Sequence, residues 1–96
     1  MAIVDIADFK EYQRIQHNHE DILIYDLLDH AEAAAVDFCR REFDEMNAPG
    51  PVKLAIMLHA GYNYEKRSVP DEKSYQAMMR AFRDLIAPYS DPDKEF

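Results

Sequence analysis

Residues 52–67, VKLAIMLHAGYNYEKR, constrain the fold of this chain more than any other stretch, because they hold its densest apolar run. A helix formed here is apolar on nearly every side and needs packing partners all round. We therefore expect a central core helix over about residues 51–66. The strongly polar residues between positions 51 and 64 are Lys53, His59 and Asn63.

Helix breakers are scarce elsewhere, with only two glycines and five prolines in 96 residues. Between them the apolar residues recur with a period near 3.6, and strand-like alternation is nearly absent. This pattern predicts an all-α fold in one domain over residues 1–96, a small bundle of about four helices. The expected helices cover residues 6–14, 19–43, 51–66 and 71–86.

The expected second helix is long and apolar on more than one side. Asp5 is the predicted N-cap of the first helix and Asn18 that of the second. The second helix should bury one stripe of apolar residues. Leu23, Leu27 and Ala34 extend this stripe, so the helix should also pack against a second neighbour. The predicted stripe contains Ile22, Tyr25, Leu28, Ala31, Ala35, Phe38 and Phe43.

Two further features concern packing and association. Ala60 and Gly61 are small, so another backbone can approach the third helix closely there. The fourth helix has one apolar face, which either belongs to the core or forms an adaptable association face. Pro88 should end this helix, and residues 88–96 should form a flexible tail. The association face contains Tyr75, Met78, Met79 and Phe82.

Composition excludes several classes of protein. The net charge is −8, and no stripe of Lys and Arg is present, which disfavours tight binding to nucleic-acid phosphates. Cys39 is the only cysteine, so no intrachain disulfide can form. Neither a signal peptide nor an apolar run long enough to span a bilayer is evident. Without other information these features describe a small acidic helical interaction protein.

One cluster of possible metal ligands occurs in the chain, at His17, His19 and Glu20, with His30 further on. The spacing favours a polar loop and helix cap, since no paired zinc-ligand motif is present. Asp26 and His30 can approach each other at i, i+4, but no nucleophile or phosphate loop accompanies them. His59 is expected to be a hydrogen-bonded core or interface histidine. We therefore expect no cofactor, metal or catalytic residue.

The end of the apolar helix carries a family pattern. Tyr64-Glu65-Lys66-Arg67 follows an Ala-rich helix and a proline-bounded turn, and Leu85-Ile86-Ala87-Pro88-Tyr89 comes later. In order and spacing, most of the chain resembles the head-tail connector (adaptor, or head-completion) family of long-tailed bacteriophages and prophages. Members of that family typically end this helix with Tyr-Glu-x-Arg and carry a later Leu-x-x-Pro-Tyr. Ser90 departs from the pattern, because many members have Arg after the Pro-Tyr.

The resemblance implies a non-enzymatic virion protein at the head-tail junction, assembled in the bacterial host cytoplasm. It implies a homo-oligomeric ring, twelvefold in this expectation, that lies beneath the portal and docks the next head-completion or tail protein. DNA would pass through the ring without specific binding, and no membrane is involved. The expected subunit or portal interface contains Tyr64, Glu65, Arg67 and Tyr89.

Three alternatives remain open at this point. For Tyr64, Glu65 and Arg67 the alternative to an interface is a helix-end ion network in which Tyr64 fills the core. For the whole chain, one rival is a small metal- or carboxylate-dependent enzyme that uses His17 and its neighbours. Another rival is an acidic helical regulator or DNA mimic. An acidic channel lining is a hypothesis that concerns Asp37, Asp44 and Glu45.

Overall fold

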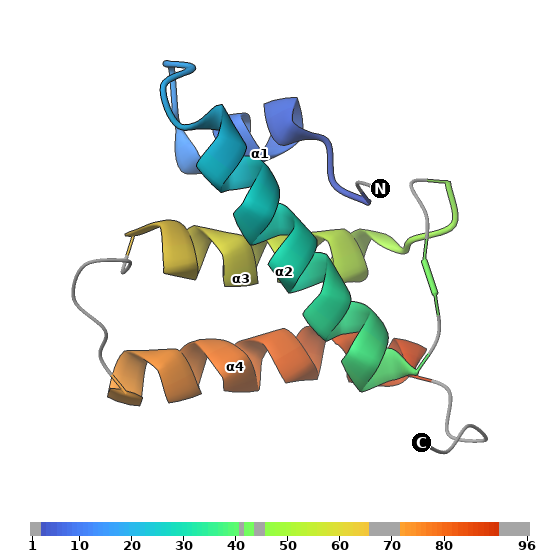
Figure 1. The fold of residues 1–96 in the computed structure, drawn as a ribbon. Helices are drawn as coiled ribbons and strands as arrows, with labels where there is room; N and C mark the ends of the chain where they lie inside the picture. Colours follow the sequence, from blue (N-terminus) through green and yellow to red (C-terminus); the bar gives the residue numbers. More distant parts are fainter. Residues whose placement is uncertain (1–2, 41, 44–45, 66–71, 91–96) are drawn as a thin grey trace.

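Helix α3 (Gly50–Glu65) runs through the middle of the molecule. In the computed structural model, which describes residues 3–40, 42–43, 46–65 and 72–90, α2 (Asp21–Cys39) crosses α3, and α4 (Glu72–Ile86) lies alongside it (Figure 1). The shorter α1 (Ile6–Gln13) packs against α2 and α3, and the 3-10 helix η1 (Ala87–Tyr89) follows α4. The described residues contain no strand, which confirms the predicted all-α bundle.

One buried cluster joins all four helices. Along α3 the buried positions 52, 55, 56, 59 and 60 follow the i, i+3, i+4, i+7, i+8 spacing of a single helical face. Apart from its first residue, only Leu54 and Glu65 of α3 are largely exposed, as expected for a helix with neighbours on most sides. The largest fully buried side chains are Phe9, Phe82, Ile3, Ile24, Leu28, Ile56, Ile86, Val52 and Cys39.

The ends of α1 and α2 partly match the prediction. Asp5 is the N-cap of α1, since its Oδ1 accepts a hydrogen bond from the Ala7 backbone N–H at 3.2 Å. The predicted cap at Asn18 is wrong, because Asn18 Oδ1 accepts from Lys10 Nζ at 2.6 Å and Glu20 occupies the cap position. The helix therefore begins at Asp21 and not at residue 19.

The predicted second helix is also too long at its C-terminal end. α2 ends at Cys39, four residues early, because Arg40 adopts the left-handed conformation with φ 58°. A residue in this conformation ends the helix, and its N–H bonds the Val36 carbonyl. Phe43, predicted as the last member of the α2 stripe, is buried in the core from outside the helix.

Three predicted members of the α2 stripe are wrong. Ile22 is 81% exposed, Tyr25 is 48% exposed and Phe38 is 38% exposed. Apolar residues surround much of this helix, so its composition does not determine which side faces α3. The prediction followed successive steps of three residues, which drift around a helix of 3.6 residues per turn. The buried stripe contains Ile24, Leu28, Ala31, Ala35 and Cys39.

The later helices agree more closely with the predicted bounds. α3 begins at Gly50, where the Pro49 carbonyl accepts from the N–H groups of residues 52 and 53. α4 ends at Ile86 as predicted, and Pro88 lies in η1 just beyond it. Tyr89 of η1 packs half-buried against the core, so the predicted tail includes residues held on the bundle. Residues 91–96 lie outside the described ranges.

No helix in the described part of the chain is long and apolar enough to span a membrane.

Candidate functional site

Tyr64, in the last turn of α3, ties that helix to the start of α2. Its hydroxyl donates a hydrogen bond to Glu20 Oε1 at 2.6 Å, and its ring meets Phe9 of α1 edge-on at 6.4 Å between centroids. Three helices therefore converge on one side chain. Tyr64 has an intramolecular role, and the sequence prediction missed its partner because Glu20 lies 44 residues away along the chain.

The other residues of the predicted interface are not gathered around Tyr64. Glu65 is the last residue of α3, and its side chain is exposed. Tyr89 is in η1 and packs against the core next to α4. Arg67 lies outside the described residues. The structure therefore provides an exposed carboxylate at the end of α3, separate from the buried contacts of Tyr64.

Gly61 lies where α1 approaches α3 closely. A Cβ built at Gly61 would lie 2.6 Å from Gln13 Oε1 and 3.6 Å from Tyr12 Cε2. The preceding residue, Ala60, is fully buried. Gly61 thus lies in the contact between the last turn of α1 and the second half of α3, and Ala60 belongs to the buried core. This contact is between helices of one subunit.

The predicted apolar face of α4 is divided between core and surface. Met78 is 6% exposed and Phe82 is 1% exposed, so both belong to the core. Met79 is partly buried against that core. Tyr75 is 41% exposed and has its ring 6.0 Å from that of Tyr62 in α3. Of the four residues, only Tyr75 offers a large surface to a partner.

The candidate metal ligands do not converge. His17 and His19 stack with ring centroids 5.0 Å apart, and His17 Nε2 lies 3.8 Å from Glu20 Oε1. His30 lies elsewhere, on α2 beside His59. Among the described residues, no three His, Cys, Asp or Glu side chains are placed to hold a metal ion. Nor does any hydrogen bond or ion pair within the described ranges join Asp26 to His30.

His59 is a core histidine of α3, in agreement with one of the predicted alternatives. It is 2% exposed, its Nδ1 lies 3.3 Å from Asn63 Nδ2, and its ring contacts Phe82 edge-on at 5.1 Å. Burial lowers the pKa of His59 below its usual value, and the nearby His30 lowers it further, while a backbone hydrogen bond opposes both. Burial in the bundle therefore favours the neutral form of His59.

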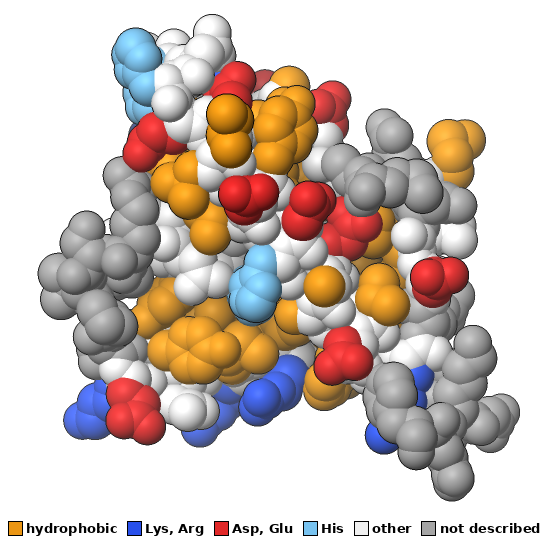
Figure 2. Space-filling model, viewed as in Figure 1, with side chains coloured by type: hydrophobic (Ala, Val, Ile, Leu, Met, Phe, Trp, Pro, Cys, Tyr) orange, Lys and Arg blue, Asp and Glu red, His pale blue; other side chains and the backbone are white. Residues whose placement is uncertain are grey.

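The outer surface of α2 is acidic, whereas α4 exposes three bases and two acids. The predicted site does not include this feature. Figure 2 shows acidic side chains along α2 and basic side chains along the lower edge of the molecule, where α4 runs. α2 contains no Lys or Arg. This segregation is visible in the sequence as five acidic residues between positions 21 and 37.

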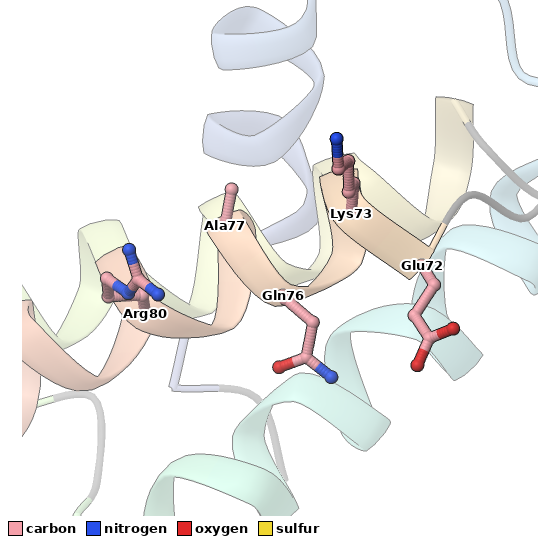
Figure 3. A pocket seen from close by; sticks show the side chains of 5 residues that line it. All are labelled: Glu72, Lys73, Gln76, Ala77 and Arg80. Atoms are coloured by element: carbon pink, nitrogen blue, oxygen red, sulfur yellow. The ribbon is translucent and has the colours of Figure 1, made fainter.

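An open depression of about 400 Å³ lies on α4. In Figure 3, Lys73, Ala77 and Arg80 project to one side of the helix, and Glu72 and Gln76 project to the other. The short side chain of Ala77 lies between the two longer basic ones. The depression thus offers space between cationic groups on a face turned away from the core.

Comparison with protein families gives one match. The family model described as phage gp6-like head-tail connector protein matches residues 3–90. The match covers all four helices and η1. No curated protein and no solved structure gives a significant match to the chain.

Proposed function

Because this chain belongs to the phage gp6-like head-tail connector family, we propose that it is a structural component of the virion at the junction between head and tail. The match over residues 3–90 carries this conclusion, since it includes every described helix. The family is one of structural connector proteins, and the separation of His17 from His30 supports no catalytic alternative.

Within that role, the chain forms a ring, twelvefold by analogy with the family, that lies beneath the portal and docks the next head-completion or tail protein. Exposed apolar side chains support self-association, because Ile22 is 81% exposed and Tyr25 and Leu54 are 48% and 41% exposed on one subunit. A cyclic assembly requires each subunit to present two different contact surfaces. The acids of α2 and the three bases of α4 supply two surfaces of that kind.

The ring extends the channel through which DNA passes. Acidic groups on the channel wall would repel the phosphate backbone, so that DNA slides without binding. Of the three acids considered for this lining, Asp37 is exposed near the end of α2 and is assigned below to a contact between subunits, and Asp44 and Glu45 lie outside the described residues. The purified assembly should not retain duplex DNA at moderate salt. Tight retention would contradict an acidic lining.

The residues after Tyr64 make the contact with the neighbouring subunit or the portal in this proposal. Glu65 is exposed, and Arg67 follows it by two residues. Arg67→Ala should leave the monomer folded, as judged by circular dichroism, and weaken association with the ring or portal. A loss of helicity without an assembly defect would instead assign Arg67 to the ion network at the helix end. Tyr89 is tested in the same way with Tyr89→Ala.

Deletion of the gene in its phage tests the function directly. Lysates of the deletion mutant should contain DNA-filled heads and separate tails that fail to join. Expression of the chain from a plasmid should restore joined particles, and a variant with its core disrupted, Phe82→Asp, serves as the inactive control. Normal infectious particles from the deletion mutant would disprove the proposed function.

A further inference from the structure

The outer surface of α2 carries a row of acidic side chains. We define the acidic face as Asp26, Asp29 and Asp37, all exposed and spaced so that they lie on one side of the helix. Within the described ranges, no ion pair joins these three carboxylates to a base. Ile22 and Tyr25, which are 81% and 48% exposed, extend this side towards the start of the helix.

The other two acids of α2 are engaged inside the subunit. Asp21 Oδ1 forms an ion pair with Lys10 Nζ at 2.5 Å. Glu32 Oε2 accepts a hydrogen bond from the Ile3 backbone N–H at 2.8 Å, and its side chain is partly buried. The acidic face is therefore the part of the charge of α2 that a partner can reach.

The outer surface of α4 carries three exposed bases and two exposed acids, Glu72 and Asp84. We define the basic face as Lys73, Arg80 and Arg83, whose exposed side chains lie away from the buried row of α4. The open depression around Ala77 lies on the same helix. A partner helix can therefore approach the backbone of α4 between the two basic positions 73 and 80.

α2 crosses α3 (Figure 1) and meets α4 near the C-terminal ends of both helices, where Cys39 Sγ donates to the Ile86 carbonyl at 3.5 Å. The residues of the acidic face and of the basic face are all exposed on one subunit. We propose that the acidic face of α2 in one copy of the chain docks on the basic face of α4 in the next copy. The inference rests on the proposed connector function and identifies its subunit contact. Because the two surfaces differ, the contact is heterologous and repeats from copy to copy, which generates a ring when the rotation closes.

The two helices match in length and in charge spacing when they run antiparallel. α2 has 19 residues and α4 has 15, so they extend about 28 Å and about 22 Å. Asp26 and Asp29 are three residues apart, as are Arg80 and Arg83, and each interval is about 4.5 Å along the axis. With Asp29 opposite Arg80, Asp26 therefore falls opposite Arg83.

The same alignment brings a third pair together. Asp37 follows Asp29 by eight residues, and Lys73 precedes Arg80 by seven. Asp37 and Lys73 therefore fall within one residue of each other, a shift of about 1.5 Å along the axis. Ala33, exposed between the second and third acids, meets the depression around position 77, where a close approach is possible.

A parallel arrangement of the two helices is less favourable. With Lys73 opposite Asp26, Asp84 falls opposite Asp37, and these two carboxylates repel each other. A shift that places Arg80 opposite Asp26 avoids the repulsion but moves Lys73 beyond the start of α2. The antiparallel alignment also places Glu72 opposite Asp37 and Asp84 one residue from Asp26. Of the alignments compared, however, it is the one that gives each of the three acids a base directly opposite or one residue away.

A charge exchange in the purified full chain tests this contact. Asp29→Lys or Arg80→Glu should each weaken self-association at least about tenfold, as measured by sedimentation over a concentration series at low salt. The double variant Asp29→Lys/Arg80→Glu restores an ion pair, with the two charges exchanged, at every contact between subunits. It should recover most of the lost self-association. Glu11→Lys, on the exposed side of α1, makes the same change of net charge as Asp29→Lys and should have little effect.

A disulfide trap tests the direction of the helices. Asp37→Cys combined with Lys73→Cys should give a ladder of covalent oligomers on oxidation, whereas either single variant gives dimers at most. Cys39 is buried and does not compete. A ladder from Ile22→Cys with Lys73→Cys, which joins the starts of the two helices, and none from the first combination would overturn the antiparallel pairing. Bridging requires Cα atoms within about 7 Å, so the trap reports close contact.

The outcomes separate this inference from the proposed function. If the wild-type chain associates but the reversals and the trap have no effect, the α2–α4 contact is wrong and the connector role stands. The contact is also overturned if the wild-type chain stays monomeric and the Asp37→Cys/Lys73→Cys variant forms no ladder, both at millimolar concentration. If Arg80→Glu abolishes only portal binding, the contact is overturned and the basic face serves the portal instead. Loss of head-tail joining on gene deletion remains the independent test of function.

Discussion

α3 and α4 belong to the same bundle but differ in how much of their surface is covered. α3 has neighbours on most sides and holds the buried residues Val52, Ile56 and Ala60. α4 buries one row, Met78, Phe82 and Ile86, and leaves the opposite side to solvent. The difference shows that α3 supports the stability of the subunit, whereas the outer face of α4 is available for contacts between subunits.

The largest expected effect compares the two helices directly. Ile56→Ala removes a fully buried side chain of α3 and should lower the free energy of unfolding by about 2–5 kcal/mol. Arg80→Ala, on the exposed side of α4, should change it by less than about 0.5 kcal/mol. Urea denaturation followed by circular dichroism measures both. If both variants lost the same free energy of unfolding, the buried face of α3 and the exposed side of α4 would contribute equally to stability.

A smaller effect is expected at the end of α3. Tyr64→Phe removes the hydroxyl that donates to Glu20 and should lower the free energy of unfolding by about 1–2 kcal/mol. The cost arises because the Glu20 carboxylate loses a donor in a partly buried site. Tyr12→Phe is the matched control, since Tyr12 is 42% exposed, and should have almost no effect. If Tyr64→Phe leaves the free energy of unfolding unchanged, the hydrogen bond between Tyr64 and Glu20 does not stabilise the contact between α3 and the start of α2.

The free energy of unfolding should depend on pH below neutrality because His59 of α3 is buried. The pKa of His59 in the folded protein lies below the unfolded value of about 6.5, so the unfolded state binds more protons below that pH. The contribution of neutral His59 is therefore complete above about pH 6.5 and is lost as the pH falls towards the folded pKa.

His59→Gln isolates that contribution, because carboxylates also titrate in the same range. The wild-type protein should lose more stability than His59→Gln between about pH 7 and about pH 5, as measured by urea denaturation. His19→Gln, in the exposed loop before α2, should keep the wild-type slope. Parallel profiles for wild type and His59→Gln would show that His59 is protonated equally in both states.

The smallest expected change is at Gly61. Alanine is favoured over glycine inside a helix by about 1 kcal/mol, but its Cβ would meet the end of the Gln13 side chain. Since that side chain is flexible, Gly61→Ala should change the free energy of unfolding by less than about 1 kcal/mol. In a Gln13→Ala background the same change should be stabilising. A large loss in both backgrounds would show that the backbones of α1 and α3 are in contact.

The fold was predictable where the local pattern of apolar and polar residues is compatible with only one arrangement of the helix. Residues 52–60 are apolar at nearly every position, so α3 had to be enclosed whatever its neighbours were. α4 has separate apolar and charged sides, and its buried row follows from that separation, whereas its end at Ile86 follows from Pro88. The Asp5 cap was predictable because it depends on a hydrogen bond to a residue two positions away.

The site was less predictable, because its contacts join residues that are distant along the chain. Tyr64 was selected from the pattern at the end of α3, but its partners Glu20 and Phe9 belong to other parts of the bundle. The acids of α2 and the bases of α4 are present in the sequence. Their relevance depends on which sides of the helices face outward, and periodicity alone did not establish this for α2.

The sequence by itself determined the helical class, the enclosed third helix and the two-sided fourth helix, because each follows from local patterns of apolar and polar residues. Only the tertiary structure decided which side of α2 is buried, since apolar residues occur around most of that helix and α3 selects among them. That selection leaves Ile22 and Tyr25 in solvent beside the acidic face. The physical reason is that burial depends on the neighbours a helix meets, which its own sequence does not contain.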